Sequence, residues 1–363
     1  MFLAALALHK AFIAAQAIRF RRNLGALMDI LDGKGRPPDH AVLAAWQTLF
    51  LVVPVVSTTF ASMAPLFAGL GRESVGWLFI DEAGQAAPQQ ATGAIWRARR
   101  VVVVGDPLQL EPVVTLPLGG QRALLRLFGV DQEWTPEFIS VQQVADRLAP
   151  RGTWLPRPGS DGSGAVWVGT PLRVHRRCDR PMFDISNEIA YDGLMVYGTQ
   201  DREPFHGRSV WYNVQSGDAR GHWIPAEGVA LRQILSSLRS QGIRAADLRV
   251  ISPFRQVAAG AMTIHREVFP DAEVDTENRW KWVGTVHTMQ GKEADVVILV
   301  LGGNPDRPNA RKFATETPNL LNVAVTRARR RLYVIGDRGT WASERYFDAL
   351  AAYVEQWQPA SQS

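Results

Sequence analysis

Residues 99–112, RRVVVVGDPLQLEP, contain four consecutive valines followed by Gly105 and Asp106. A short run of apolar β-branched residues is typical of a parallel strand that helices cover on both faces. Ligands of open parallel sheets bind beyond the carboxyl ends of the strands. We therefore expect Asp106 to lie at a ligand-binding edge, where Gln109 can sense a terminal phosphate oxygen. A plain turn after the strand is the alternative, because Gly-Asp-Pro also favours turns.

Residues 77–85, WLFIDEAGQ, show the same pattern, since an apolar run ends at Asp81 and Glu82. An acidic pair at such an edge is suited to a hydrated Mg²⁺ ion, because Mg²⁺ takes oxygen ligands and keeps several waters. We assign the metal to Asp81, through water, and expect Glu82 to act as the general base for attack of water on a phosphate. The alternative is a helix N-terminus, where the helix dipole favours acidic residues.

The rest of the chain alternates short apolar runs with helical stretches. This alternation predicts an α/β protein with mainly parallel sheets flanked by helices. The predicted strands are residues 51–57, 77–80, 101–104, 209–214, 249–252, 282–286, 296–301 and 332–335. The predicted helices are residues 85–97, 180–191, 227–240, 256–268, 320–329 and 341–357.

The composition of the 363 residues is that of a globular protein, with 46% hydrophobic and 21% charged residues, and excludes a wholly disordered or fibrous chain. The net charge of +5 fits a polyanionic partner. The single cysteine, Cys178, excludes an intrachain disulfide framework and favours a reducing, cytoplasmic location. We expect no membrane partner, because no apolar stretch reaches the roughly 20 residues of a membrane span. The apolar N-terminal segment is expected to be a helix rather than a signal peptide, since its charges follow the apolar run.

The two acidic segments, in this order and spacing, resemble motifs II and III of the superfamily 1 helicases, in the Upf-like branch. Residues 171–195, PLRVHRRCDRPMFDISNEIAYDGLM, are similar to motif IV of that family. Arg177 takes the place of the motif's arginine, which faces the nucleotide. His175 and Arg176 depart from the family pattern, which has Gln and Tyr at these positions.

Two later segments extend the resemblance. Residues 283–299, VGTVHTMQGKEADVVIL, are similar to motif V, and residues 320–337, LLNVAVTRARRRLYVIGD, resemble motif VI, with Arg327 in the place of the arginine finger. The motif V positions that match the family's nucleotide contacts are Gln290, Gly291 and Glu293.

The resemblance implies two RecA-like domains, with ATP and Mg²⁺ between them and single-stranded DNA or RNA across their tops. It predicts an incomplete first domain over residues 1–130 and a second domain over residues 165–345. A connector rich in Gly, Pro and Ser is expected over residues 131–164, and a helix end with a polar tail over residues 346–363.

The resemblance also implies roles for individual residues. Catalysis is expected from Glu82, Gln109, Arg177 and Arg327. Nucleotide contacts are expected from Asp81, Asp106, Gln290, Gly291 and Glu293. Nucleic-acid contacts are expected from Ser57, Thr58, Thr59 and His287, although capping of a following helix explains the three hydroxyl residues equally well. Arg329 to Arg331 are expected to form a solvated helix end.

The chain lacks the P-loop sequence G-x-x-x-x-G-K-[ST] that such enzymes use to bind phosphates. We expect the chain to be the C-terminal part of a longer helicase, whose N-terminal segment or another subunit supplies this loop. The acidic pair and the arginines all remain, which favours this hypothesis over a degenerate relative. The alternative function is a non-catalytic nucleic-acid-binding or scaffold protein with a helicase fold.

Overall fold

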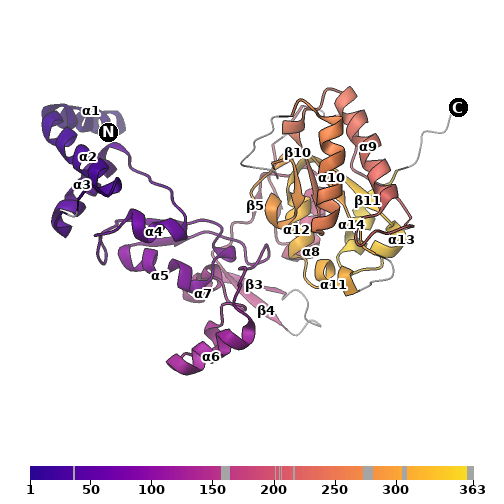
Figure 1. Cartoon of the computed structure of the whole chain (residues 1–363), viewed down its shortest axis with the longest axis horizontal. Coiled ribbons are helices and arrows are strands. Elements are labelled where there is room, and N and C mark those ends of the chain that lie inside the picture. The colour runs from indigo at the N-terminus through magenta and orange to yellow at the C-terminus, as the bar shows by residue number, and fades with distance from the viewer. Residues whose placement is uncertain are drawn as a thin grey trace. The chain divides into compact units, whose positions relative to one another are not determined.

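The computed structural model describes residues 1–35, 37–156, 164–200, 202–203, 205, 207–215, 217–272, 281–304 and 309–357. Contacts between residues divide the chain into two compact units (Figure 1). Unit 1 comprises Met1–Asp106 and Glu111–Ala145, whereas unit 2 comprises Pro107–Leu110 and Asp146–Ser363. The chain therefore enters unit 2 briefly after Asp106 and returns to unit 1 before it finally leaves.

Unit 1 consists, in its described residues, of helices and one parallel pair of short strands. β1 (Leu78–Ile80) pairs with β2 (Val101–Val103), and Ile80 lies beside Val103. A helical core contains Trp46 and Phe67. The helices of this unit are α1 (Phe2–Ala15), α2 (Ala17–Leu31), α3 (Asp39–Val52), α4 (Phe60–Leu66), α5 (Pro88–Arg97), α6 (Leu118–Phe128) and α7 (Val141–Leu148), whose last residues belong to unit 2.

The strand predicted at residues 51–57 is wrong. Helix α3 continues to Val52, and the residues from Val53 to Thr59 form no helix or strand. Pro54 explains the helix end, because it lacks an N–H group and disfavours helical geometry in the residue before it. The apolar side chains of Val53 and Val55 are exposed, so this segment lacks the burial that a core strand would have.

The predicted N-terminal helix is confirmed, but α1 buries none of its side chains. In the described residues, no helix alone has the length and apolar composition needed to cross a membrane. Helices α1 and α2 meet that test only as a pair, and they are bent by 80° at the break between them.

Unit 2 contains a six-stranded parallel sheet in the order β12-β7-β11-β10-β8-β9. The central strand β10 (Ala294–Val300) is almost wholly buried, as its uninterrupted apolar sequence predicts. Its neighbours are β11 (Ala328–Gly336) and β8 (Leu248–Ser252). The outer strands are β7 (Val210–Asn213), β9 (Val283–Thr285) and the edge strand β12 (Glu355–Gln356). The predicted α/β fold with a mainly parallel sheet is confirmed.

Helices flank this sheet in two groups (Figure 1). α9 (Pro225–Ser240) packs against α10 (Arg255–Val268), and α8 (Met182–Tyr191) packs against both α12 (Asn319–Thr326) and α14 (Phe347–Tyr353). The remaining elements of unit 2 are α11 (Asn309–Thr315), α13 (Arg338–Trp341), an antiparallel hairpin of β3 (Gly152–Pro156) and β4 (Ala165–Gly169), and a parallel pair of β5 (Val174–His175) and β6 (Val196–Tyr197).

Three segments differ from the sequence prediction. The segment predicted as an irregular connector, residues 131–164, contains α7 and β3, although residues 157–163 lie outside the described part. The helix predicted at residues 320–329 ends at Thr326, and a strand begins at Ala328. The helix predicted at residues 341–357 is divided between α13, α14 and β12. The sheet explains the last two differences, because ladder hydrogen bonds to neighbouring strands outweigh local helix propensity.

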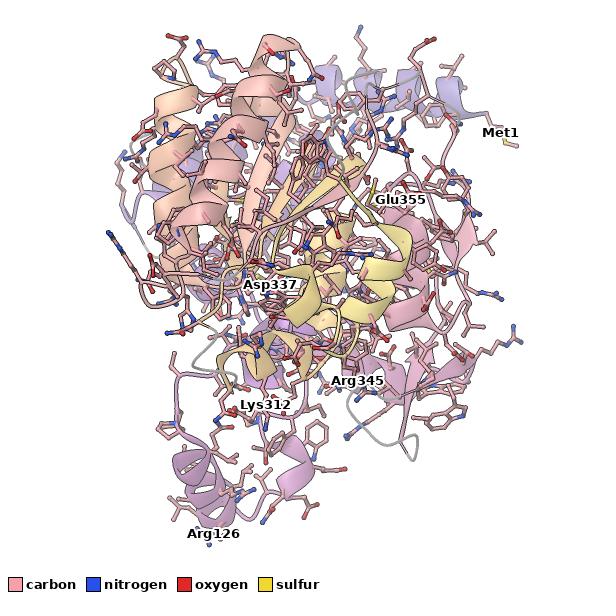
Figure 2. All side chains as sticks on the ribbon, turned by 90° about the vertical axis from the view of Figure 1, so that its right-hand side faces the viewer. Met1, Arg126, Lys312, Asp337, Arg345 and Glu355 are labelled. Atoms are coloured by element: carbon pink, nitrogen blue, oxygen red, sulfur yellow. The ribbon has the colours of Figure 1, made fainter. Side chains whose placement is uncertain are left out.

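Glu227 of α9 carries a carboxyl group that is fully buried in unit 2. Its Oε2 accepts a hydrogen bond from the backbone N–H of Gly302 at 2.9 Å, whereas Oε1 has no partner among the described residues. Burial raises the pKa of Glu227 from 4.5 to about 8; the Gly302 N–H opposes this rise, and the charge of Asp337, which is labelled in Figure 2, adds to it. The carboxyl is therefore largely protonated at neutral pH.

This buried carboxyl predicts a pH dependence of stability. Because its pKa is higher in the folded than in the unfolded chain, the free energy of unfolding falls as pH rises from about 4.5 to about 8. Glu227→Gln keeps an acceptor for Gly302 but cannot ionise, so the loss of Tm between about pH 5.5 and about pH 8.5 should shrink. Thermal melts at both pH values test this, with exposed Glu316→Gln as the control. Equal pH dependence in all three proteins would contradict the prediction.

Candidate nucleotide and nucleic-acid site

The acidic residues predicted in unit 1 lie at one edge of its sheet. Asp81 and Glu82 follow β1, and Asp106 follows β2; because the two strands are parallel, their carboxyl ends share that edge. The backbone N–H of Glu82 donates to Asp81 Oδ1 at 3.0 Å, and Gln85 Nε2 donates to Glu82 Oε2 at 3.1 Å. Asp81 and Glu82 are both exposed, so their carboxylates are open to a solvent-borne ligand.

The backbone around this acidic edge is tightly packed and locally strained. Glu82 has φ 53°, in the left-handed region that a residue with a side chain adopts at a cost of roughly 1–3 kcal/mol. A Cβ atom on Gly84 would lie 2.7 Å from the backbone oxygen of Asp106, and one on Gly105 would lie 2.8 Å from the backbone nitrogen of Ala83. Only glycines allow the two loops to approach this closely. Such strain is typical of functional sites.

The carboxylates are compatible with a Mg²⁺ ion held through water. Asp81, Glu82 and Asp106 offer only oxygen donors, the type that Mg²⁺ prefers. No group of three or more His, Cys, Asp or Glu side chains in the described residues is arranged to bind a metal directly. The water-mediated contact of Asp81 with a metal stays a prediction.

The hydroxyl residues Ser57, Thr58 and Thr59 are exposed on the loop that precedes α4. Thr59 caps that helix, since its Oγ1 accepts a hydrogen bond from the N–H of Ser62 at 3.3 Å. The helix-capping alternative is therefore confirmed for Thr59. Contact of the three residues with nucleic acid stays a prediction.

The segment that carries Gln109 is bound in unit 2. The backbone oxygen of Gln109 accepts a hydrogen bond from Asn319 Nδ2, and that of Leu108 accepts one from Asn322 Nδ2 at 3.1 Å. The side chains of Leu108 and Leu110 enter the core of unit 2. Gln109 is thus attached to α12, the helix that leads directly into Arg327, whereas Asp106 remains in unit 1.

Arg177 and Glu293, two of the predicted nucleotide residues, are in direct contact. Arg177 Nε lies 2.9 Å from Glu293 Oε2, and both side chains are partly exposed. Because neither is fully buried, this ion pair is weak, with a typical contribution of about 0–1 kcal/mol. A phosphate oxygen is able to compete with Glu293 for the guanidinium.

Gln290 and Gly291 lie just before this ion pair, after the short 3₁₀ helix His287–Met289. Gly291 has φ +74° with no atom within 4 Å of a Cβ position, so backbone conformation rather than space requires glycine there. The His287 ring stacks on Phe313 with centroids 6.3 Å apart. Partial burial and the charge of Arg255 lower the pKa of His287, which favours the neutral imidazole at pH 7.

Arg327 is only 2% exposed. Its Nε donates to the backbone oxygen of Val323 at 3.2 Å. Cys178 is adjacent: Cys178 Sγ contacts the Thr326 oxygen at 3.5 Å, and the charges of both Arg177 and Arg327 act on the thiol. Burial raises the pKa of Cys178 to about 12, so the thiol stays protonated and serves packing.

The prediction that Arg329 belongs to a solvated helix end is wrong. Arg329 lies in β11 and is in contact with two carboxylates, Asp295 at 2.8 Å and Glu293 at 3.6 Å. A β-bulge brings them together, because the ladder passes from Ala294 opposite Ala328 to Val296 opposite Arg331. Arg329 therefore holds the carboxylate that pairs with Arg177.

Three contributors to this site were not found by sequence reasoning. They are Asn319 and Asn322, which bind the Gln109 segment, and Arg329. The sequence did contain one indication of the asparagines. They are two amides three residues apart at a predicted helix, and this spacing places them on the same helix face. Nothing local in the sequence indicated their partner, which is more than 200 residues distant.

Comparison with known proteins agrees with the order of the motifs. Two family models, each described as an AAA domain, match residues 47–116 and 170–339, which contain the acidic edge and the arginine site respectively. The chain belongs to the superfamily 1 helicases. Within this superfamily, the motifs and the relatives fit the Upf-like branch.

Individual helicases are similar over most of this chain. The DNA polymerase alpha-associated DNA helicase A of Schizosaccharomyces pombe is 25% identical over 316 residues, which cover 84% of this chain and 44% of that protein. The human RNA helicase Mov10l1 is 25% identical over 308 residues, covering 76% of this chain and 23% of that protein. The solved arterivirus nonstructural protein 10 helicase matches 72% of this chain and 39% of its own, with 18% identity and a TM-score of 0.32. The chain thus spans less than half the length of these relatives.

Proposed function

We propose that this chain supplies the catalytic and nucleic-acid-binding residues of an ATP-dependent helicase or translocase that moves on single-stranded nucleic acid. The contact between Arg177 and Glu293, with Arg327 beside the same buried thiol, carries this proposal. Three residues from separate helicase motifs meet there in unit 2. An equivalent grouping in unit 1 is the acidic edge of Asp81, Glu82 and Asp106.

The chemistry of each residue suits ATP hydrolysis. A Mg²⁺ ion, when bound, neutralises charge on the phosphates, and the water-mediated ligand for it is Asp81. Glu82 accepts a proton from the attacking water. Arg177 and Arg327 stabilise the charge that develops on the transferred phosphoryl oxygens, because guanidinium groups bind such oxygens in a fixed geometry.

Gln109 is suited to couple hydrolysis to movement. Its backbone is held by Asn319 of α12, and Arg327 directly follows that helix. A change at the terminal phosphate that Gln109 senses would therefore be passed to the same helix that positions Arg327. This coupling requires two discrete arrangements of the segment, one for each nucleotide state.

A phosphate cradle is the part of such a site that these residues lack, since the sequence contains no P-loop. We assign that role to a polypeptide segment or subunit outside these 363 residues. The same observation favours the second candidate function, a non-catalytic nucleic-acid-binding protein with a helicase fold. The two candidates differ in ATP hydrolysis but share single-strand binding.

Single-strand binding is tested by fluorescence anisotropy with labelled oligothymidylate and oligouridylate. We expect weak binding whose logarithmic salt dependence has a slope of about −0.7 per phosphate contact, with little preference for sequence. His287→Ala should weaken binding several-fold, whereas His40→Ala, an exposed control in unit 1, should not. Affinity that is independent of salt, or equal effects of the two substitutions, would argue against the proposed interface.

A further inference from the structure

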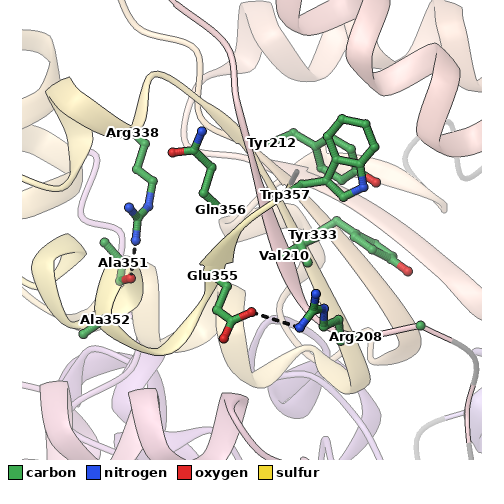
Figure 3. A pocket seen from close by; sticks show the side chains of 11 residues that line it. Arg208, Val210, Tyr212, Tyr333, Arg338, Ala351, Ala352, Glu355, Gln356 and Trp357 are labelled. Carbon is green, nitrogen blue, oxygen red and sulfur yellow. Dashed lines mark hydrogen bonds and ion pairs between the residues drawn. The ribbon is translucent and has the colours of Figure 1, made fainter. Parts of the chain in front are cut away.

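A pocket of about 620 Å³ lies in unit 2 among the edge strand β12, β7, β11, α13 and α14 (Figure 3). None of the predicted site residues lines it. The element that it shares with the arginine site is β11, where Tyr333 lies four residues beyond Arg329, roughly 13 Å along the strand at about 3.3 Å per residue. The pocket is therefore separate from the proposed hydrolytic site of this chain.

Aromatic rings form one wall of the pocket. Trp357 stacks on Tyr212, with centroids 5.2 Å apart and planes inclined by 22°, and Tyr212 also contacts Tyr333 (Figure 3). The backbone N–H of Trp357 donates to the Trp211 oxygen at 2.8 Å, so a ladder hydrogen bond holds the main chain while the stack on Tyr212 positions the ring. Trp357 nevertheless remains 44% exposed. A fixed, half-exposed indole offers a ready surface for stacking a planar ring.

Charged groups also line the pocket. Arg208 pairs with Glu355 at 3.0 Å, and Arg338 Nη2 donates to the Ala351 oxygen (Figure 3). Both members of the Arg208–Glu355 pair are exposed, so the pair contributes little to stability and exchanges readily. A phosphate forms stronger, bidentate hydrogen bonds with a guanidinium and is able to displace the carboxylate.

We propose that this pocket binds a nucleoside monophosphate unit, with the base stacked on Trp357 and the phosphate on Arg208. A planar ring joined to a dianion matches a pocket lined by both aromatic rings and an exchangeable arginine, and the volume lies within the usual range for small-molecule sites. The unit is either a free nucleotide or one residue of a single strand. This site does not depend on the hydrolytic function proposed above.

Calorimetric titration of the full chain with AMP, ribose 5-phosphate and oligothymidylate tests the proposal and separates the two sources. AMP should bind, and ribose 5-phosphate, which lacks the base, should bind at least about tenfold more weakly. If the natural ligand is a strand, the oligonucleotide should bind more tightly than AMP. Failure of both AMP and the oligonucleotide to bind through this pocket would overturn the proposal.

Substitutions locate the binding. Trp357→Ala should weaken AMP binding about tenfold or more, and Trp357→Phe, which keeps a ring, should retain most of it. Trp154→Ala, a similarly exposed tryptophan on β3, is the matched control and should have no effect. Unchanged affinity in Trp357→Ala would overturn the proposal.

Two arginine variants distinguish this pocket from the hydrolytic site. Arg208→Ala should also lower AMP affinity, and because its side chain is exposed the protein should remain folded, which melting curves check. Arg177→Ala, which removes a phosphate-binding group of the hydrolytic site, should lower AMP affinity less than Arg208→Ala does. Loss of AMP binding in Arg177→Ala but not in Arg208→Ala would assign the nucleotide to that site and reject this pocket.

Discussion

Glu82→Gln is expected to lower kcat for ATP hydrolysis by about 10²–10⁴-fold in the assembled enzyme, that is, this chain together with the P-loop polypeptide that we propose. Gln keeps the size of Glu and still accepts the hydrogen bond from Gln85, but it cannot take a proton from the attacking water. The affinity for ATP should change little, because the base acts mainly in the transition state. Steady-state hydrolysis and fluorescent-nucleotide titration measure the two quantities separately.

The control for Glu82 is Glu73→Gln, which also changes an exposed glutamate with a positive φ in unit 1. Glu73 precedes β1, whereas the acidic edge follows that strand, so kcat should be retained. A Glu82→Gln enzyme with near-normal turnover would show that another residue is the base. A parallel loss of turnover in both variants would indicate damage to unit 1 rather than lost chemistry.

Arg327→Ala is expected to lower kcat by about 10³–10⁵-fold, the range for arginine fingers in other phosphoryl-transfer enzymes. The charge on the phosphoryl oxygens is larger in the transition state than in the ground state, so Kd for ATP should change less than kcat. Single-turnover hydrolysis and nucleotide titration of the same preparation test this split.

Because Arg327 is buried, its removal also affects packing, and a second variant is needed. Arg327→Lys keeps the charge but loses the planar fork, and should remain folded and slow. Arg266→Ala, at an exposed position of α10, is the control expected to keep full turnover. Normal turnover in Arg327→Lys would contradict the role of a guanidinium finger. Arg329 is unsuitable as a control, since it contacts Glu293.

The sheet of unit 2 could be predicted because its strands are continuous apolar runs. β8, β10 and β7 lie within a residue or two of their predicted positions. A short, continuous apolar run is typical of a parallel strand that is buried on both faces, and β8 and β10 are buried in that way. The failure at residues 51–57 has the opposite cause. The run there is equally apolar, but its side chains are exposed in the structure. The prediction failed because it assumed from composition alone that this run is buried.

The acidic edge could also be predicted, since parallel strands bring the residues that follow them to one side. Asp81 and Asp106 were found in this way. The network of Arg177, Glu293 and Arg329 could not be, because it depends on a bulge in the register between β10 and β11. No pattern within either segment specifies how two strands align.

The most direct test of the central claim is the steady-state rate of ATP hydrolysis in the presence of single-stranded DNA or RNA, measured for this chain alone and together with a P-loop polypeptide. We expect negligible turnover for the chain alone, and turnover of roughly 1–10³ per second, stimulated by single strands, for the assembled enzyme. Turnover in that range by the chain alone would contradict this expectation. So would an assembled enzyme whose rate of hydrolysis does not change when single-stranded nucleic acid is added.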